Sequence, residues 1–179
     1  SAAVSMLRAA DSTRRGRLGE DVVSILADDN PALAARMALA LPAGTYQVSA
    51  VDLASRTWVL TDPKAALAWA MQLTEPNTAI AARRAVTAEL VRTDPDEAID
   101  LILAFPEGSA RDDTLVIAAG AWARRRADEA IAWLDTLPED ELRERLTSSI
   151  GFELAQTHPT RALELAERLP EGRNRWLLL

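Results

Sequence analysis

The sequence is built on a 32-residue repeat, and this repeat constrains the fold more than any other feature. Residues at the same position in successive repeats form a column, and three columns carry the pattern. Proline opens the unit in four copies of five, alanine follows at the third position after it in every copy, and leucine or phenylalanine follows seven positions after the alanine. The three columns are Pro31, Pro63, Pro95, Ala127 and Pro159; Ala34, Ala66, Ala98, Ala130 and Ala162; and Leu41, Leu73, Phe105, Leu137 and Leu169. Five copies in register without an insertion indicate a repeated structural unit.

Each unit predicts a short helix followed by a long one. The short helix is clearest in 63–73, where Asp62 stands at the N-cap and Pro63 at the first helical position, which needs no N–H donor. Its apolar residues recur at helical spacing. In four of the five copies a Leu-Pro or Phe-Pro pair ends the short helix, because the residue before proline avoids helical geometry. The long helix, of about 15 residues, is predicted to start at a second cap column. That column is Thr13, Thr45, Asn77 and Ser109.

Two helices per unit predict an all-α fold, an α-solenoid of antiparallel helix pairs with about five repeats in a single domain. The units are 30–61, 62–93, 94–125 and 126–157, with partial units near 1–29 and 158–179. In the first partial unit, Ala2 falls in the alanine column and Leu18 to Asp28 fit the long helix. The other end, Trp176 to Leu179, is apolar, whereas terminal repeats are usually polar. We therefore expect the chain to be a piece of a longer protein.

Two of the short helices carry residues that resemble a known family. Asp94-Pro-Asp-Glu-Ala-Ile-Asp-Leu101 and Ala127-Asp-Glu-Ala-Ile-Ala-Trp133 are similar to the second helix of a tetratricopeptide repeat. The period is shorter than the one of about 34 residues that is typical of that family. The tryptophan, glycine and tyrosine of the family's first helix are not at their expected positions. The resemblance is thus to a divergent branch, and it implies a right-handed superhelical scaffold that binds peptides or proteins on its concave face.

Several columns alternate with twice the period of the repeat. Gly44, Gly108 and Gly172 alternate with Pro76 and Asp140; Trp58 and Trp122 alternate with Leu90 and Leu154; Trp69 and Trp133 alternate with Met37, Leu101 and Leu165. We interpret the tryptophans as packing residues, because a large side chain in one unit needs a smaller one beside it in a densely filled core. A binding groove lined by the tryptophans is the alternative.

Composition and motifs exclude several classes of function. With 49% apolar and 26% charged residues the chain is not disordered, and its longest apolar run, 114–123, is too short to span a membrane. There is no cysteine and one histidine, His158, which falls in the short-helix cap column and is interpreted as a surface turn residue. No phosphate-binding glycine loop or calcium loop is present, and the acidic clusters lie at predicted helix ends, where they offset the helix dipole. We therefore expect a protein that is not an enzyme and has no cofactor or metal.

The arginines are the one feature that suggests a binding site. Lys64 is the only lysine, so nearly all the positive charge is guanidinium, whose forked donors suit carboxylate or phosphate groups. One column, Arg111, Arg143 and Arg175, lies four positions after Glu107, Glu139 and Glu171, so we interpret it as self-paired, with ligand binding as the alternative. A second group, Arg83, Arg84, Arg92 and Arg124, has no such acidic partners and is the better candidate for a binding patch.

The leading hypothesis is therefore a non-catalytic scaffold that binds an extended or helical segment of another protein, with acidic character. The alternative is a structural or regulatory arm of a larger enzyme, such as an envelope enzyme, whose catalytic domain lies outside this chain. Nucleic-acid binding ranks third, because the net charge of −7 opposes it. The use of arginine and alanine with a single lysine is typical of GC-rich bacterial genomes.

Overall fold

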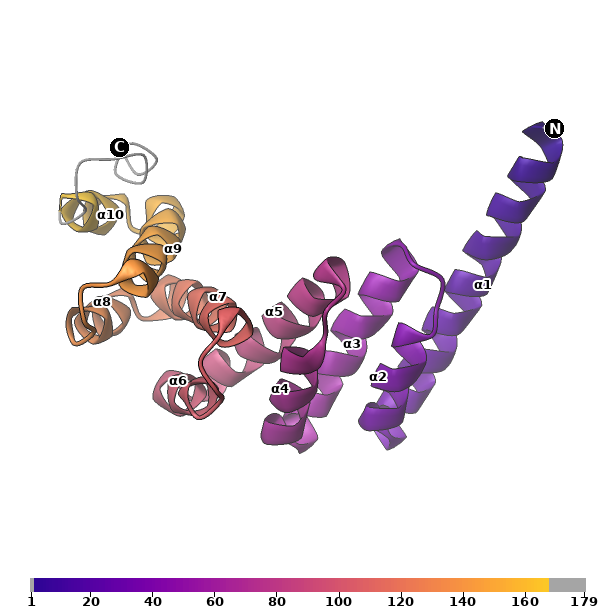
Figure 1. Ribbon diagram of the computed structural model, residues 1–179, viewed down its shortest axis with the longest axis horizontal. Coiled ribbons are helices and arrows are strands. Elements are labelled where there is room, and N and C mark those ends of the chain that lie inside the picture. Colours follow the sequence, from indigo (N-terminus) through magenta and orange to yellow (C-terminus); the bar gives the residue numbers. More distant parts are fainter. Residues whose placement is uncertain (1, 168–179) are drawn as a thin grey trace. The chain divides into compact units, whose positions relative to one another are not determined.

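The computed structural model describes the backbone of residues 2–167 and the side chains of Asp11 and residues 13–167. This part of the chain forms ten helices and no strand (Figure 1), which confirms the prediction of an all-α fold. The helices are α1 (Ala2–Asp29), α2 (Pro31–Leu39), α3 (Thr45–Thr61), α4 (Pro63–Gln72), α5 (Pro76–Thr93), α6 (Pro95–Leu103), α7 (Ser109–Arg125), α8 (Ala127–Asp135), α9 (Glu141–Thr157) and α10 (Pro159–Ala166). None of these described helices has the length and apolarity needed to cross a membrane.

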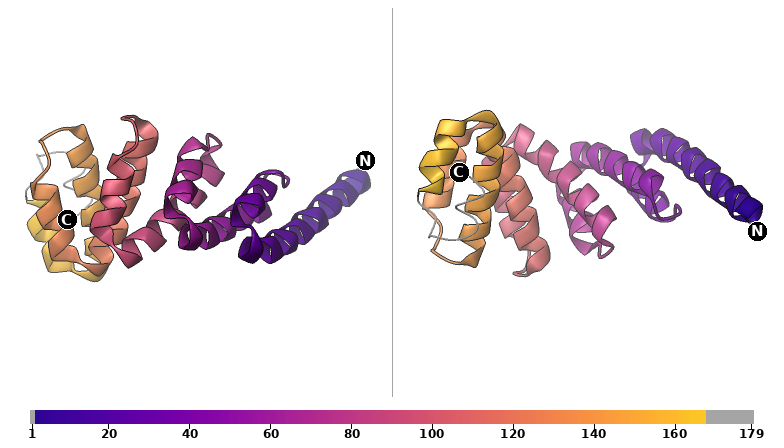
Figure 2. Two further views of the ribbon diagram at one scale, coloured as in Figure 1. Left: turned by 90° about the horizontal axis from the view of Figure 1, so that it is seen from below. Right: turned by 90° about the horizontal axis from the view of Figure 1, so that it is seen from above.

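The chain divides into two compact halves, and helices pack as neighbours within each. In the N-terminal half, Ser1–Glu89, α1 packs against α2 and α3, α2 against α3, and α3 against α4. In the C-terminal half, Leu90–Leu179, α7 packs against α6, α8 and α9, and α9 also packs against α8 and α10. The pairs α3 with α4 and α9 with α10 can be followed in all views (Figures 1 and 2).

The short helices begin where the proline column predicts. α2, α4, α6, α8 and α10 start at positions 31, 63, 95, 127 and 159. Asn30, Asp62 and Asp94 are N-caps, and each side chain accepts a hydrogen bond of 3.0 Å from a backbone N–H of the first helical turn. This bond satisfies a donor that the first turn of a helix otherwise leaves open. His158 occupies the same position before α10, is exposed, and places its Nδ1 3.0 Å from Thr157 Oγ1.

The predicted starts of the long helices are wrong by one position. Thr45 and Ser109 are the first helical residues of α3 and α7, so the N-cap positions belong to Gly44 and Gly108. Both glycines have positive φ, +144° and +154°, with ψ near 180°. Residues that carry a side chain rarely adopt this backbone conformation. Glycine recurs at this position in every second repeat because the turn before the long helix requires this backbone conformation.

Where the glycine is absent, a carboxylate caps the long helix instead. Asp140 precedes α9 and accepts a 2.9 Å hydrogen bond from the backbone N–H of Arg143. α5 begins at Pro76, and the carboxylate of Glu75 accepts from the backbone N–H groups of Thr78 at 2.8 Å and Asn77 at 3.2 Å. The bonds from Thr78, then those from Asn77, lower the pKa of Glu75. Asn77, predicted as the cap, thus lies inside the helix.

We expect the substitution Gly44→Ala to lower the free energy of unfolding by about 1–2 kcal/mol, because alanine does not tolerate the φ of +144°. No atom lies within 4 Å of the position that a Cβ would take, so any loss measures the backbone alone. Urea denaturation followed by circular dichroism would measure it. The matched control is Ala43→Ser in the same exposed turn, which should stay within about 0.5 kcal/mol. Equal stability of both variants would contradict this account of the glycine.

The first partial unit differs from the prediction in being a single helix. α1 runs unbroken from Ala2 to Asp29, and Thr13, predicted as a helix start, lies within it. The reason is visible in the sequence: Ala9 and Ala10 stand where four of the five other units have Leu-Pro or Phe-Pro, and alanine favours a continuous helix. The side chain of Ala2 lies outside the described residues.

The alanine column forms the centre of the packing. Ala34, Ala66, Ala98, Ala130 and Ala162 are all between 0% and 1% exposed. They lie on the short helices, which pack closely on the long ones. A position that admits only a methyl group in every unit allows the helix backbones to come close together.

The tryptophans pack against one another in pairs. Trp58 of α3 and Trp69 of α4 have ring centroids 5.7 Å apart at an interplanar angle of 44°. Trp122 of α7 and Trp133 of α8 repeat this contact at 5.8 Å and 45°. Each pair joins a long helix to the short helix that follows it. Tryptophan therefore recurs in every second repeat because the same aromatic contact is made twice. This agrees with the interpretation of the tryptophans as packing residues.

Candidate binding surface

The column of Arg111 and Arg143 lies in the first turn of a long helix. In the N-terminal half this column holds Gln47, whose Nε2 donates 3.0 Å hydrogen bonds to the backbone carbonyls of Leu39 and Leu41. Leu39 is the last residue of α2 and Leu41 lies two positions beyond it, where helical partners run out. The position is thus suited to a side chain that binds back to the preceding turn.

Arg111 and Arg143 also bind groups of their own chain at this position, through ion pairs. Arg111 lies 3.6 Å from Glu107 and 3.0 Å from Asp112, and its side chain is only 14% exposed. Arg143 lies 3.3 Å from Glu139 and 3.7 Å from Asp135, the last residue of α8. The structure therefore places both arginines against carboxylates of their own chain. Arg175 and Glu171, the third pair of this column, lie outside the described residues.

Arg83 is a buried residue, which removes it from the surface on which a partner could bind. It is 9% exposed, and its Nη2 donates a 3.4 Å hydrogen bond to the carbonyl of Leu73, at the end of α4. Ala79 occupies the Gln47 column in this unit and cannot reach that turn, so Arg83, one helical turn later, supplies the donor. Its Nε is buried without a hydrogen-bond partner in the part of the chain that the structure describes.

Arg92 and Arg124 both lie in the last turn of a long helix. A cation is stabilised there by the negative end of the helix dipole. Arg124 also forms an ion pair with Glu153 of α9, with Nε and Oε2 3.6 Å apart. The expectation that Arg124 has no acidic partner is therefore wrong, because the partner comes from a neighbouring helix and not from its own. Arg92 is exposed.

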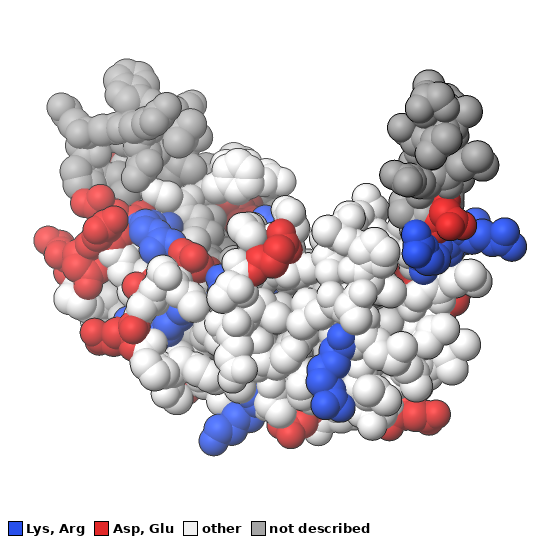
Figure 3. All heavy atoms as spheres, turned by 45° about the vertical axis from the view of Figure 1, so that its right-hand side comes forward, with Lys and Arg blue, Asp and Glu red and all other residues white. Residues whose placement is uncertain are grey.

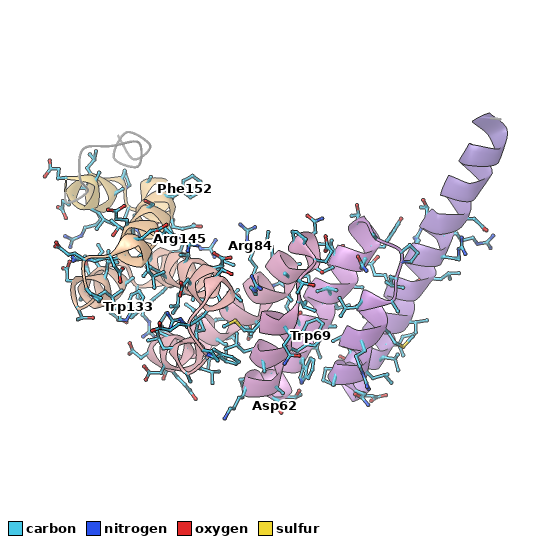
Figure 4. The ribbon with its side chains drawn as sticks, viewed as in Figure 1. Asp62, Trp69, Arg84, Trp133, Arg145 and Phe152 are labelled. Atoms are coloured by element: carbon cyan, nitrogen blue, oxygen red, sulfur yellow. The ribbon has the colours of Figure 1, made fainter. Side chains whose placement is uncertain are left out.

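Arg84 is the member of the predicted patch that remains available to a ligand. It is exposed on α5 (Figure 4), and no ion pair of its side chain occurs within residues 13–167. Ile80, one helical turn earlier on the same face, is 48% exposed. An exposed guanidinium beside an exposed apolar side chain can bind a carboxylate and a neighbouring apolar group together.

Ion pairs between helices of the C-terminal half were not predicted from the sequence. Arg145 of α9 pairs with Asp113 of α7, and Arg161 of α10 pairs with Asp128 of α8 at 3.0 Å. In Figure 3, acidic and basic side chains lie side by side over this half, at the left of the view. Asp113 and Arg145 belong to one column, so opposite charges separated by one repeat were a usable signal. These charges are neutralised within the chain.

Two arginines have their pKa values raised by nearby carboxylates. The hydrogen bond that Arg56 donates to Asp52, 2.8 Å away on α3, raises the pKa of Arg56 above its usual value. Glu164, followed by Asp128, raises the pKa of Arg161. Arginine is already fully protonated near neutral pH, so these shifts leave its charge unchanged.

Among the described residues, no group of three or more His, Asp or Glu side chains could hold a metal ion.

Comparisons of the chain with protein-family models, with curated proteins and with solved structures find no significant match.

Proposed function

We propose that this protein is a non-catalytic scaffold that binds an acidic, partly apolar segment of another protein. In this proposal the helix pairs form an α-solenoid of about five repeats, a right-handed superhelix of the tetratricopeptide-like kind. The regular recurrence of short-helix starts supports it, as do the alanine column and the repeated tryptophan contact. Helical repeats of this type expose side chains of the long helices to a partner.

The observation that carries the proposal is the exposed pair Ile80 and Arg84 on α5. Arg83, Arg111, Arg124 and Arg143 each bind a group of their own chain. Arg84 does not, within the described residues, and its guanidinium is free to pair with a carboxylate. Ile80 adds apolar area next to that charge, and burying it on binding contributes about 25 cal/mol per Å².

The test is binding to an array of acidic peptides that differ in their apolar residues, measured by fluorescence polarisation. We expect the tightest peptide to lose about tenfold in affinity with Arg84→Glu, since the variant replaces attraction with repulsion. The matched control is Arg36→Glu, which reverses another exposed charge, on α2, and should leave affinity unchanged. An equal loss in both variants would mean a general charge effect and would overturn the assignment of Arg84.

A structural or regulatory arm of a larger enzyme is the second candidate. The ion pairs Arg145–Asp113, Arg124–Glu153 and Arg161–Asp128 favour it, because they link helices of the C-terminal half and leave those charges unavailable to a ligand. If no peptide of the array binds above background, this second function is preferred. Nucleic-acid binding has no supporting observation beyond the arginines themselves.

A further inference from the structure

An exposed face of α6 combines negative charge with an apolar side chain. Asp96, Asp100 and Leu103 are spaced by four and then three positions, so they share one face of the helix. Both aspartates are exposed, and Leu103 is 42% exposed. We call these three residues the α6 face. The residues that α6 buries are others: Pro95, Ala98, Ile99 and Ile102.

Helix stability accounts for only part of the charge on the α6 face. Asp96 lies in the first turn of α6, where the positive end of the helix dipole stabilises a carboxylate. Asp100 lies in the last turn, where the same dipole disfavours a negative charge. Within residues 13–167, neither aspartate side chain forms an ion pair. The carboxylate of Asp100 is therefore available to a cation from outside the fold.

The repeat does not account for the α6 face either. If the pairing of an acidic residue with leucine served the packing of every unit, the other short helices would show it at the same positions. In the columns of Asp100 and Leu103, α4 has Ala68 and Met71, and α8 has Ala132 and Asp135. The combination is thus particular to α6 among these three helices.

The exposed pair on α5 matches the α6 face when the two helices run antiparallel. A helix rises about 1.5 Å per residue, so Arg84 lies about 6 Å along α5 from Ile80, and Asp100 lies about 4.5 Å along α6 from Leu103. With Ile80 against Leu103 in an antiparallel pair, Arg84 faces Asp100. A parallel pair with the same apolar contact would carry Arg84 past the end of α6, because Leu103 is its last residue.

We propose that a second copy of this chain supplies the acidic, partly apolar segment, with α5 of one copy binding α6 of another in antiparallel orientation. Ile80 then contacts Leu103, and Arg84 pairs with Asp100. The proposal rests on the proposed function, because it names the partner of the same α5 site. Charge complementarity selects this occupant, since the two faces carry opposite charges at matching spacing. Packed helices lie about 8–10 Å apart, a separation across which an arginine and an aspartate can meet.

Charge reversal tests the pairing, with sedimentation velocity over a wide range of protein concentrations as the measurement. We expect the unaltered chain to associate as its concentration rises, because every copy carries both faces. Arg84→Glu and Asp100→Arg should each weaken association about tenfold, because each brings like charges together. The double variant with both changes should associate as the parent does, since it restores an opposite pair with the charges exchanged.

Net charge alone would give a different order of association. The parent and the double variant both have a net charge of −7, whereas Asp100→Arg is less negative and would associate more readily if general repulsion governed the outcome. The matched control is Glu144→Arg, which makes the same change of charge at an exposed position of α9 and should associate as the parent does. Leu103→Gln leaves the charge unaltered and should weaken association by removing the apolar contact.

Three results would overturn the proposal. A chain that stays monomeric at every concentration would exclude a second copy as the partner. Equal effects of Asp100→Arg and Glu144→Arg would indicate a general charge effect. A double variant that stays monomeric, with the helical content and melting temperature of the parent, would show that Arg84 and Asp100 do not pair.

The peptide array separates a failure of this proposal from a failure of the proposed function. If acidic peptides bind through Arg84 while the chain stays monomeric, the binding site stands and only the second copy is excluded as its partner. If the chain associates as proposed, a peptide that binds at Arg84 should compete with α6 and lower the average mass. If neither peptides nor a second copy bind at Arg84, both proposals fail.

Discussion

Replacing Trp122 with alanine is expected to lower the free energy of unfolding by about 3–5 kcal/mol. Trp122 is 2% exposed in the C-terminal half, and its ring packs against that of Trp133 at 5.8 Å. Truncation removes the largest fully buried side chain of the described residues and leaves a cavity that the surrounding helices fill only in part. Urea denaturation followed by far-ultraviolet circular dichroism would measure the loss.

Two variants separate the sources of this effect. Trp58→Ala removes the same ring from the other aromatic pair, but Trp58 is partly exposed, so its loss should be smaller. Trp122→Phe keeps most of the ring and removes the indole N–H, which is buried without a hydrogen-bond partner among the described residues. Since an unpaired buried donor is itself destabilising, this variant should lose much less than Trp122→Ala. If Trp58→Ala and Trp122→Ala cost the same, burial does not govern the contribution of these rings.

The short helices could be predicted from the sequence because local chemistry determines where they begin. An aspartate or asparagine followed by proline is favoured at the start of a helix, and Asn30, Asp62 and Asp94 form the expected bonds. The start of a long helix is a weaker signal. Thr45 and Ser109 have side chains that suit a cap, but the adjoining glycines take a positive φ that no side-chain pattern reveals.

The candidate site could be predicted only in part. The position of a residue in the repeat indicates which helix carries it, but it does not show which groups its side chain contacts. The pairing of Arg111 with Glu107 followed from spacing along the chain. The partner of Arg124 lies on a neighbouring helix, and the burial of Arg83 depends on the lack of a donor at Ala79. Both facts depend on contacts between helices. Arg83 and Arg124 are therefore no longer part of the predicted binding patch, because each binds a group of its own chain.

The alanine column allows the sharpest test of the repeat itself. We expect Ala98→Leu to cost about 1–3 kcal/mol, because Ala98 is 1% exposed on α6, which packs against α7, and a leucine there would overpack the contact. Leucine is nearly as good a helix former as alanine, so helix propensity contributes little. The matched control is Ala132→Leu, at an exposed position of α8, which should stay within about 0.5 kcal/mol of the parent. A thermal melt in which Ala98→Leu matches both the parent and Ala132→Leu would show that close helix contact does not explain why all five units have alanine here.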